Sequence, residues 1–300
     1  MPAFVQITGD GPHFAVIPST SLCLNVLITR GMTKTFRVVL LVVVAIGSMA
    51  AAEPRRPTGR WVVDYDDAQC VASRNYGTDD KPLFLALKPS PTGSVMRVML
   101  IRNGASSAAE QRPASIRFDG KTAIPVNALS YGDAKAKRHL ASINLPMETF
   151  AANRRASTIE IKGSWFNERL AVGGLTGVMA AFDDCLANLR QVWNVGAPYS
   201  SRISRPAQSK RPLRDLFRST TYPHQAMMEG NTGRVGLALL IDEAGKVRDC
   251  MIEETSGYAT LDTMSCYTIT THARFEPAIG ADGRPVKSAS FHRINWRIGP

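Results

Sequence analysis

The order of turns and apolar segments between residues 222 and 298 admits few folds. A short helix of one to two turns is expected at its start, where the missing amide hydrogen of Pro223 costs nothing. An alternating apolar run at 233–242 predicts a strand, and a second strand is expected at 246–254. The turn between them places Gly245 where a positive φ is needed, so the two strands should form a hairpin.

The rest of this segment predicts one more helix and one more strand. Ser256 is placed to cap a helix over 258–273, and a third strand is expected over 286–298. The third strand should run antiparallel to the first and pair with it, which gives the order second, first, third and leaves the third strand at an edge. Alternation then directs His292, Ile294, Trp296 and Ile298 toward the helices and Lys287, Arg293 and Arg297 outward.

An edge strand carries unpaired backbone amides and carbonyls, and it pairs with another extended segment unless something covers it. In such pairing, main-chain hydrogen bonds supply the affinity and alternate side chains supply the selectivity. The opposing interpretation is that the edge is blocked by the preceding linker, by self-pairing in a dimer, or by its own Lys and Arg side chains.

Several short motifs occur in one order along this segment. They include Tyr222-Pro, the Gly-Asn-Thr-Gly-Arg-Val run at 230–235, Thr255-Ser-Gly, Arg274-Phe-Glu-Pro-Ala, Asp282-Gly-Arg-Pro-Val and Ile294-Asn-Trp-Arg-Ile. This order resembles the carboxy-terminal domain of the TonB family, over about residues 215–298. The resemblance implies that the last strand pairs with extended segments of outer-membrane TonB-dependent receptors during energy-dependent transport. The implied contact residues are Val286, Lys287, Ala289, Phe291, Arg293, Asn295 and Arg297.

Residues 32–52 have the features of a secretory signal peptide. Basic residues after Met32 precede an apolar stretch of about fifteen residues, which is shorter than the roughly twenty that cross a bilayer, and small residues follow it. Cleavage after Ala50 or Ala52 is expected, which would release the protein into the periplasm. An uncleaved inner-membrane anchor is the alternative. Residues 1–31 precede this signal, and we interpret them as a spurious extension ahead of a true start at Met32.

Four of the five cysteines follow residue 52, an even number that suggests two disulfides in an oxidising compartment. Three pairings are possible, and the domain boundaries favour Cys70–Cys185 and Cys250–Cys266. A metal site is not expected, because no Cys-x-x-Cys or histidine cluster accompanies these residues. Two buried free thiols at Cys250 and Cys266 are the alternative for the second pair.

The chain after the signal is expected to contain two domains of an α+β protein. The first, at 59–195, should be an all-β sandwich or barrel-like domain closed by a helix over 176–192, and it weakly resembles periplasmic domains of the invasion-associated-locus-B type. A linker rich in Pro, Ser and basic residues at 196–214 should space this domain from the TonB-like domain at 215–300, which has a three-stranded antiparallel sheet and two helices. Strands of the first domain are expected at 61–65, 70–74, 83–87, 95–101, 115–118, 141–145 and 158–161.

Composition excludes some classes of function. The net charge is +11, and loss of residues 1–52 leaves 33 basic and 24 acidic residues, a net charge of +9. In an exported protein a nucleic-acid partner is not expected, and this charge could attract acidic peptides, anionic lipid or the cell wall. A contribution to solubility alone is the other interpretation, and the composition slightly favours it. No nucleophile elbow, zinc-protease motif, phosphate-binding loop or dinucleotide fingerprint is present, so no enzymatic activity and no cofactor are expected. The alternative to a receptor partner is a periplasmic structural module that binds peptides or cell wall without energy transduction.

Overall fold

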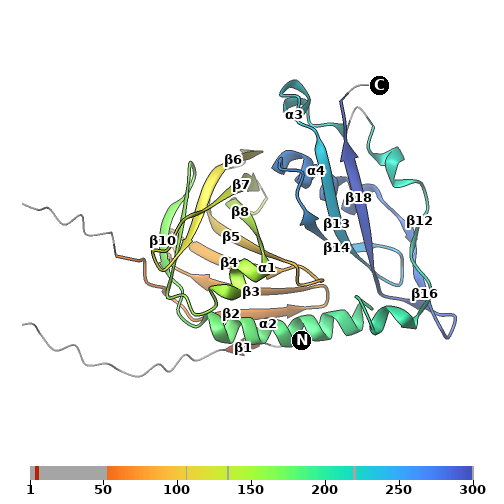
Figure 1. Ribbon diagram of the computed structural model, residues 1–300, viewed down its shortest axis with the longest axis horizontal. Coiled ribbons are helices and arrows are strands. Elements are labelled where there is room, and N and C mark those ends of the chain that lie inside the picture. Colours follow the sequence, from red (N-terminus) through yellow and green to blue (C-terminus); the bar gives the residue numbers. More distant parts are fainter. Residues whose placement is uncertain (1–3, 7–52, 106, 134, 219–220, 299–300) are drawn as a thin grey trace, which may run out of the picture. The chain divides into compact units, whose positions relative to one another are not determined.

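The computed structural model describes residues 4–6 and 53–298, except 106, 134 and 219–220. The predicted signal peptide therefore lies outside the described residues. The described part mixes α and β structure, with mostly strands and four α-helices (Figure 1). Its residues from Pro54 onward belong to one compact unit.

The first half of the chain forms one curled sheet of ten strands, in the order β1-β2-β3-β4-β5-β8-β7-β6-β9-β10. The sequence favoured a sandwich or a barrel; the strands instead form a single sheet in which every neighbouring pair is antiparallel. The strands are β1 (Phe4–Gln6), β2 (Val62–Asp66), β3 (Gln69–Asn75), β4 (Leu83–Pro89), β5 (Val95–Asn103), β6 (Ser107–Phe118), β7 (Ile124–Asp133), β8 (Arg138–Pro146), β9 (Thr158–Gly163) and β10 (Asn167–Ala171).

All seven strands expected in this half are present, and three further strands were not anticipated. β7 contains Pro125 and Asn127, which usually interrupt a strand, and β10 is largely polar. β1 lies within the segment interpreted as a spurious extension, and it pairs with β2. A short helix, α1 (Met147–Ala152), was also missed; its Phe150 is fully buried against Phe118.

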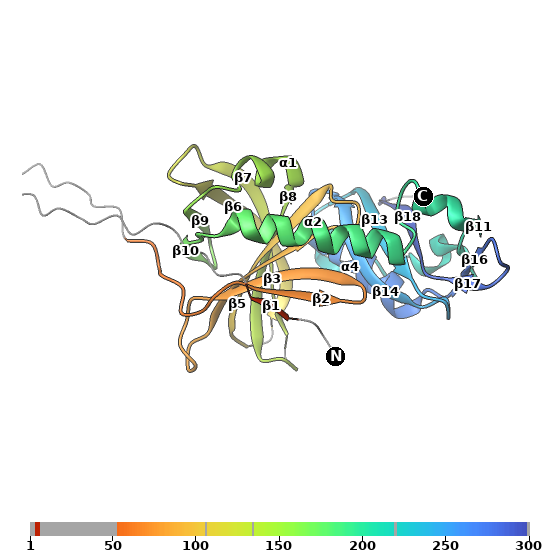
Figure 2. The same ribbon diagram turned by 90° about the horizontal axis from the view of Figure 1, so that it is seen from below.

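Helix α2 (Leu175–Val192) agrees closely with the helix expected over 176–192, and it lies across β2 and β3 (Figure 2). Its buried face includes Val178, Phe182 and Leu189. The predicted disulfide between Cys70 on β3 and Cys185 on α2 is present and joins the helix to the sheet. Closing so long a loop contributes on the order of 4–5 kcal/mol in the chain-entropy model.

The stretch predicted as a spacer is folded against the carboxy-terminal domain. Within it, β11 (Ile203–Arg205) pairs with β16 (Ala278–Gly280), and β12 (Gln208–Ser209) pairs with β15 (Phe275–Glu276). Single turns of 3-10 helix at Tyr199–Arg202 and Leu213–Leu216 flank these strands. Residues 203–209 therefore do not run free between the two domains, because their backbone groups find partners on the domain that follows.

The carboxy-terminal sheet has the predicted order, β14-β13-β18. β13 (Gly233–Ile241) is the central strand and is antiparallel to both β14 (Val247–Glu254) and β18 (Ser288–Trp296). Two helices accompany the sheet, α3 (His224–Met228) and α4 (Ala259–His272). The core between sheet and helices contains Leu237, Leu239, Leu261 and Ile269. The expected third strand begins later than residue 286, because β17 (Pro285–Val286) pairs with β16 instead.

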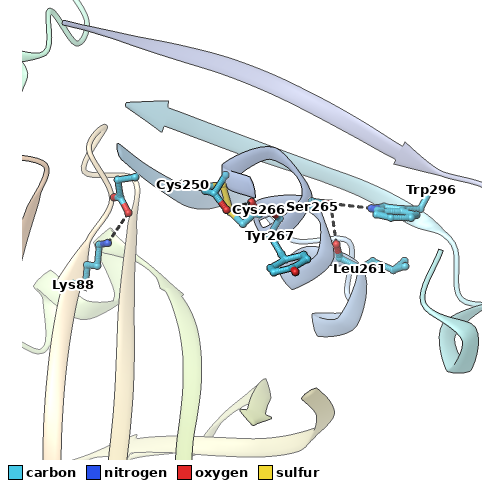
Figure 3. The surroundings of a disulfide bond; sticks show 9 residues. Lys88, Cys250, Leu261, Ser265, Cys266, Tyr267 and Trp296 are labelled. Atoms are coloured by element: carbon cyan, nitrogen blue, oxygen red, sulfur yellow. Dashed lines mark hydrogen bonds and ion pairs between the residues drawn. A yellow bond between two sulfur atoms is a disulfide. The ribbon is translucent and has the colours of Figure 1, made fainter. Parts of the chain in front are cut away.

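A disulfide fixes α4 to the sheet. Cys266 on the helix is bonded to Cys250 on β14, as the sequence predicted (Figure 3). A loop of this length contributes roughly 3 kcal/mol in the chain-entropy model, which matters for a domain with a small core.

The start of α4 differs from the expectation that Ser256 caps it. The helix begins at Ala259, and its N-cap residue, Tyr258, makes no side-chain capping hydrogen bond. The Ser256 hydroxyl accepts a hydrogen bond only from the Tyr258 amide, at 3.1 Å, ahead of the helix. Instead, the Asp262 carboxylate accepts hydrogen bonds from the Ser256 amide (2.9 Å), the Ser256 hydroxyl (2.7 Å) and the Thr255 hydroxyl (2.5 Å). Burial raises the pKa of Asp262, while these three hydrogen bonds oppose that rise. The Thr255-Ser-Gly turn ahead of α4 is thus held by the carboxylate of Asp262, which lies in the first turn of that helix.

Gly245 is required by two independent constraints. Its φ is +75°, as predicted for the turn between β13 and β14, and a Cβ atom there would collide with the Phe275 carbonyl oxygen. The approach is close because the Phe275 amide donates a hydrogen bond to the Gly245 carbonyl at 3.0 Å. The hairpin turn therefore also positions the chain after α4.

We predict that Gly245→Ala lowers the free energy of unfolding by about 2–5 kcal/mol. This loss is the sum of the strain of an alanine in the left-handed region and the cost of overpacking its Cβ against Phe275. Gly283→Ala is the matched control, because Gly283 has a φ of +78° and nothing within 4 Å of the added Cβ. It should cost only about 1–2 kcal/mol. Urea unfolding measures both, and equal losses in the two variants would contradict the role of the Phe275 contact.

His292 on β18 should make stability depend on pH. Its Nε2 lies 2.7 Å from the Ser290 hydroxyl, its ring lies 6.0 Å from that of Phe275, and burial lowers its pKa from the ordinary value of 6.5. The folded state therefore favours the neutral ring. Its contribution to stability is complete above about pH 6.5 and is lost as the pH falls through 6.5 toward the lower folded pKa.

We therefore expect His292→Gln to make the fall of the melting temperature below about pH 6.5 less steep. The decline should not vanish, because burial and then the nearby Arg102 also lower the pKa of His139 in the first half. His272→Gln, at an exposed position on α4, is the control and should leave the pH profile unchanged. An unaltered profile in the His292 variant would refute this assignment.

Candidate partner-binding edge

β18 pairs with β13 along its whole length, from Ser288 opposite Ile241 to Trp296 opposite Gly233. No described strand pairs with its other side, so β18 is an edge of the carboxy-terminal sheet (Figure 1). The linker was one predicted candidate for blocking this edge. Its two short strands pair with β15 and β16 instead.

The face of β18 turned toward the helices is firmly anchored. Ile294 and Trp296 are buried, and the Trp296 indole nitrogen donates to the Ser265 hydroxyl on α4 at 2.9 Å (Figure 3). That hydroxyl in turn donates to the Leu261 carbonyl at 2.8 Å. Edge-to-face contacts with Phe217 (5.4 Å) and Tyr222 (5.0 Å) complete the surroundings of Trp296. Ile298, which was expected on this face, is exposed beyond the end of the strand.

The opposite face of β18 is exposed in its second half. Phe291 is 55% exposed, and Arg293 and Asn295 are also exposed. Arg293 reaches Glu254 on β14 at 3.5 Å across the middle strand. Gly236 lies between them in the register of both ladders, and its missing side chain leaves room for this ion pair.

The structure separates the predicted contact residues into two groups. Val286 lies in β17, and Ala289 packs against the core of the first half. The Lys287 carbonyl accepts a hydrogen bond from the Asn194 amide at 2.9 Å, and its ammonium lies 5.1 Å from the ring of Trp193. These three residues therefore have contacts within the chain. The exposed group comprises Phe291, Arg293, Asn295 and Arg297.

The other edge of the sheet, β14, lies against the turn between β4 and β5. Lys88 forms an ion pair with Asp249 at 2.9 Å, and both side chains are largely buried (Figure 3). The Glu253 carboxylate accepts hydrogen bonds from the hydroxyls of Thr92 (2.9 Å), Ser90 (3.3 Å) and Ser94. The sequence did not predict this contact, since the Ser-Pro-Thr-Gly-Ser run at 90–94 indicates only a turn.

One oxygen of each of these two acids, Asp249 Oδ2 and Glu253 Oε1, is buried without a hydrogen-bond partner among the described residues. Desolvated carboxylates are costly to bury, so the cation and the three hydroxyls that face them are needed to hold this junction. The sheet thus has one edge against the first half of the chain and one edge without a strand partner among the described residues.

No helix in the described part of the chain combines the length and the apolar character needed to pass through a bilayer. No curated protein matches the chain significantly.

Residues 218–298 match the family described as "Gram-negative bacterial TonB protein C-terminal". This family is associated with transport rather than catalysis, and its members contact outer-membrane receptors. The match covers α3, the three strands of the carboxy-terminal sheet and α4, and it confirms the resemblance seen in the sequence. This part of the chain is therefore similar to the TonB carboxy-terminal domain.

Proposed function

We propose that the free edge of β18 binds an extended segment of an outer-membrane receptor by adding it as a fourth strand to the sheet. The observation that carries this proposal is the asymmetry of the sheet: β14 lies against the first half, whereas β18 pairs with no described strand except β13. An unpaired edge offers backbone donors and acceptors at the regular strand spacing, and an extended peptide satisfies them.

The side chains beside this edge indicate the chemistry of the segment. Phe291 offers an exposed aromatic ring, and Arg297 has no ion-pair partner among the described residues. An extended segment with an apolar residue opposite Phe291 and an acidic residue near Arg297 fits best. The nine residues of β18 leave room for a segment of similar length.

We expect receptor amino-terminal peptides to shift and protect backbone amides of the full-length chain within 288–296. In the matched control, the same peptide carries N-methyl groups on alternate residues, which keeps its side chains and removes its donors toward β18. Loss of several backbone hydrogen bonds should weaken binding about tenfold or more. Amide shifts and hydrogen exchange measured by NMR report both peptides. Equal affinities of the two peptides for the chain, or amide shifts confined to β14, would exclude the addition of a strand to β18.

The setting that we propose for this activity is the periplasm, with residues 32–52 as the export signal. TonB proteins are periplasmic or anchored in the inner membrane. A second candidate function is a periplasmic module that binds peptides or cell wall without transmitting energy. The folding of residues 203–209 onto the carboxy-terminal domain favours it, because this stretch cannot act as a long arm.

Fractionation distinguishes the two functions. The second function predicts a mature protein in the soluble periplasmic fraction. Mass spectrometry should show that this protein begins near Glu53. Transduction predicts an intact segment 32–52 and attachment to membranes that survives a salt wash. Replacing Ala50 and Ala52 with leucine should block cleavage and move a processed protein to the membrane fraction. No change in its size or its fraction would show that 32–52 is not processed.

A further inference from the structure

A cavity of about 610 Å³ lies between the curled sheet and the carboxy-terminal domain. One wall is formed by residues of β5, β7 and β8, and the other by β14 and α4. The walls are tied together by the Lys88–Asp249 ion pair and by Gln111, whose side-chain amide bonds to the Gly257 carbonyl and the Ala259 amide. This cavity is separate from the edge of β18, which contributes no residue to it.

Arg97 supplies the charge on the sheet side of this cavity. It lies on β5 directly opposite Asn144 of β8, and its Nε donates to the Asn144 side-chain oxygen at 3.3 Å. The two terminal nitrogens of its guanidinium have no hydrogen-bond partner among the described residues. Burial lowers the pKa of Arg97, and the negative charge of Asp249 opposes that effect. An arginine in such surroundings gains from an anion that occupies its free donors.

The two acids that line the cavity have other partners, although Asp249 Oδ2 has no hydrogen bond among the described residues. Asp249 is paired with Lys88, and Asp262 accepts hydrogen bonds from Thr255 and Ser256. Arg248 also lines the cavity and is exposed, with no ion pair in the part of the chain that the structure describes. The cavity therefore has more positive than negative charge free to meet a ligand.

Rather more than half of the remaining lining is apolar, and the rest consists of uncharged polar side chains. Met99 and Leu129 line the sheet side, and Tyr267 and the Cys250–Cys266 disulfide line the helix side (Figure 3). A pocket of this kind, mainly apolar with a few convergent polar groups, is typical of sites for small organic molecules. Its volume also falls within the usual range of about 300–1,000 Å³.

We propose that this cavity binds a small amphipathic carboxylate. The carboxylate meets the guanidinium of Arg97, and the apolar body lies between Leu129 and Tyr267. The site is independent of the peptide-binding edge, so either can be present without the other.

Phenylbutyrate is a suitable probe, and its neutral analogue phenylbutanamide has the same body without the charge. Calorimetric titration of the full chain should show binding of phenylbutyrate. NMR spectra recorded with the same ligand should show shifts of the backbone amides of Asn144 and Thr263. The analogue and the Arg97→Gln variant should each bind about tenfold more weakly or worse, because a charge-assisted hydrogen bond is lost. Unchanged affinity in Arg97→Gln, or no binding of phenylbutyrate at millimolar concentration, would overturn the proposal.

A second variant tests the cavity without removing the arginine. Thr263→Trp places a large ring in the space on the helix side and should abolish binding. Thr271→Trp is its matched control, because Thr271 lies on the same helix at an exposed position and does not line the cavity. The control should bind phenylbutyrate like the unaltered protein. Binding that persists in Thr263→Trp, or amide shifts confined to β18, would place the ligand elsewhere and refute the proposed site.

Discussion

The burial of two acids on β14 is the constraint on which the arrangement of the rest depends. Asp249 and Glu253 are tolerable there only because Lys88 and the hydroxyls of the β4–β5 turn face them. This contact orients the carboxy-terminal sheet so that β14 lies against the first half of the chain. It also leaves β18 as the edge without a strand partner among the described residues, and it holds the two walls of the Arg97 cavity.

The carboxy-terminal domain could be predicted from the sequence because its signals are local. Gly245 specifies its turn, the alternation in β13 specifies a buried face, and the spacing of Cys250 and Cys266 suits a strand crossed by a helix. β7 was not predicted, because Pro125 and Asn127 usually interrupt strands and the sequence does not show which strands lie on either side of this one.

The long-range contacts could not be predicted in the same way. Lys88 and Asp249 are separated by 161 residues, and each looks like an ordinary surface charge in its own segment. The same holds for Arg97, whose free donors matter only because β14 and α4 lie opposite it. The pairing of the linker could not be predicted for a related reason: its Pro, Ser and basic residues indicate an exposed stretch, but do not reveal that β15 and β16 offer it partners.

The connectivity of the two disulfides bears on how the chain acquires them. Of the four cysteines after residue 52, the first is bonded to the second and the third to the fourth, so the two loops do not interleave. A chain that enters an oxidising compartment amino terminus first can close its first bridge before Cys250 emerges. Vectorial oxidation in that order yields the native pairs without reshuffling, so maturation should have little need of a disulfide isomerase.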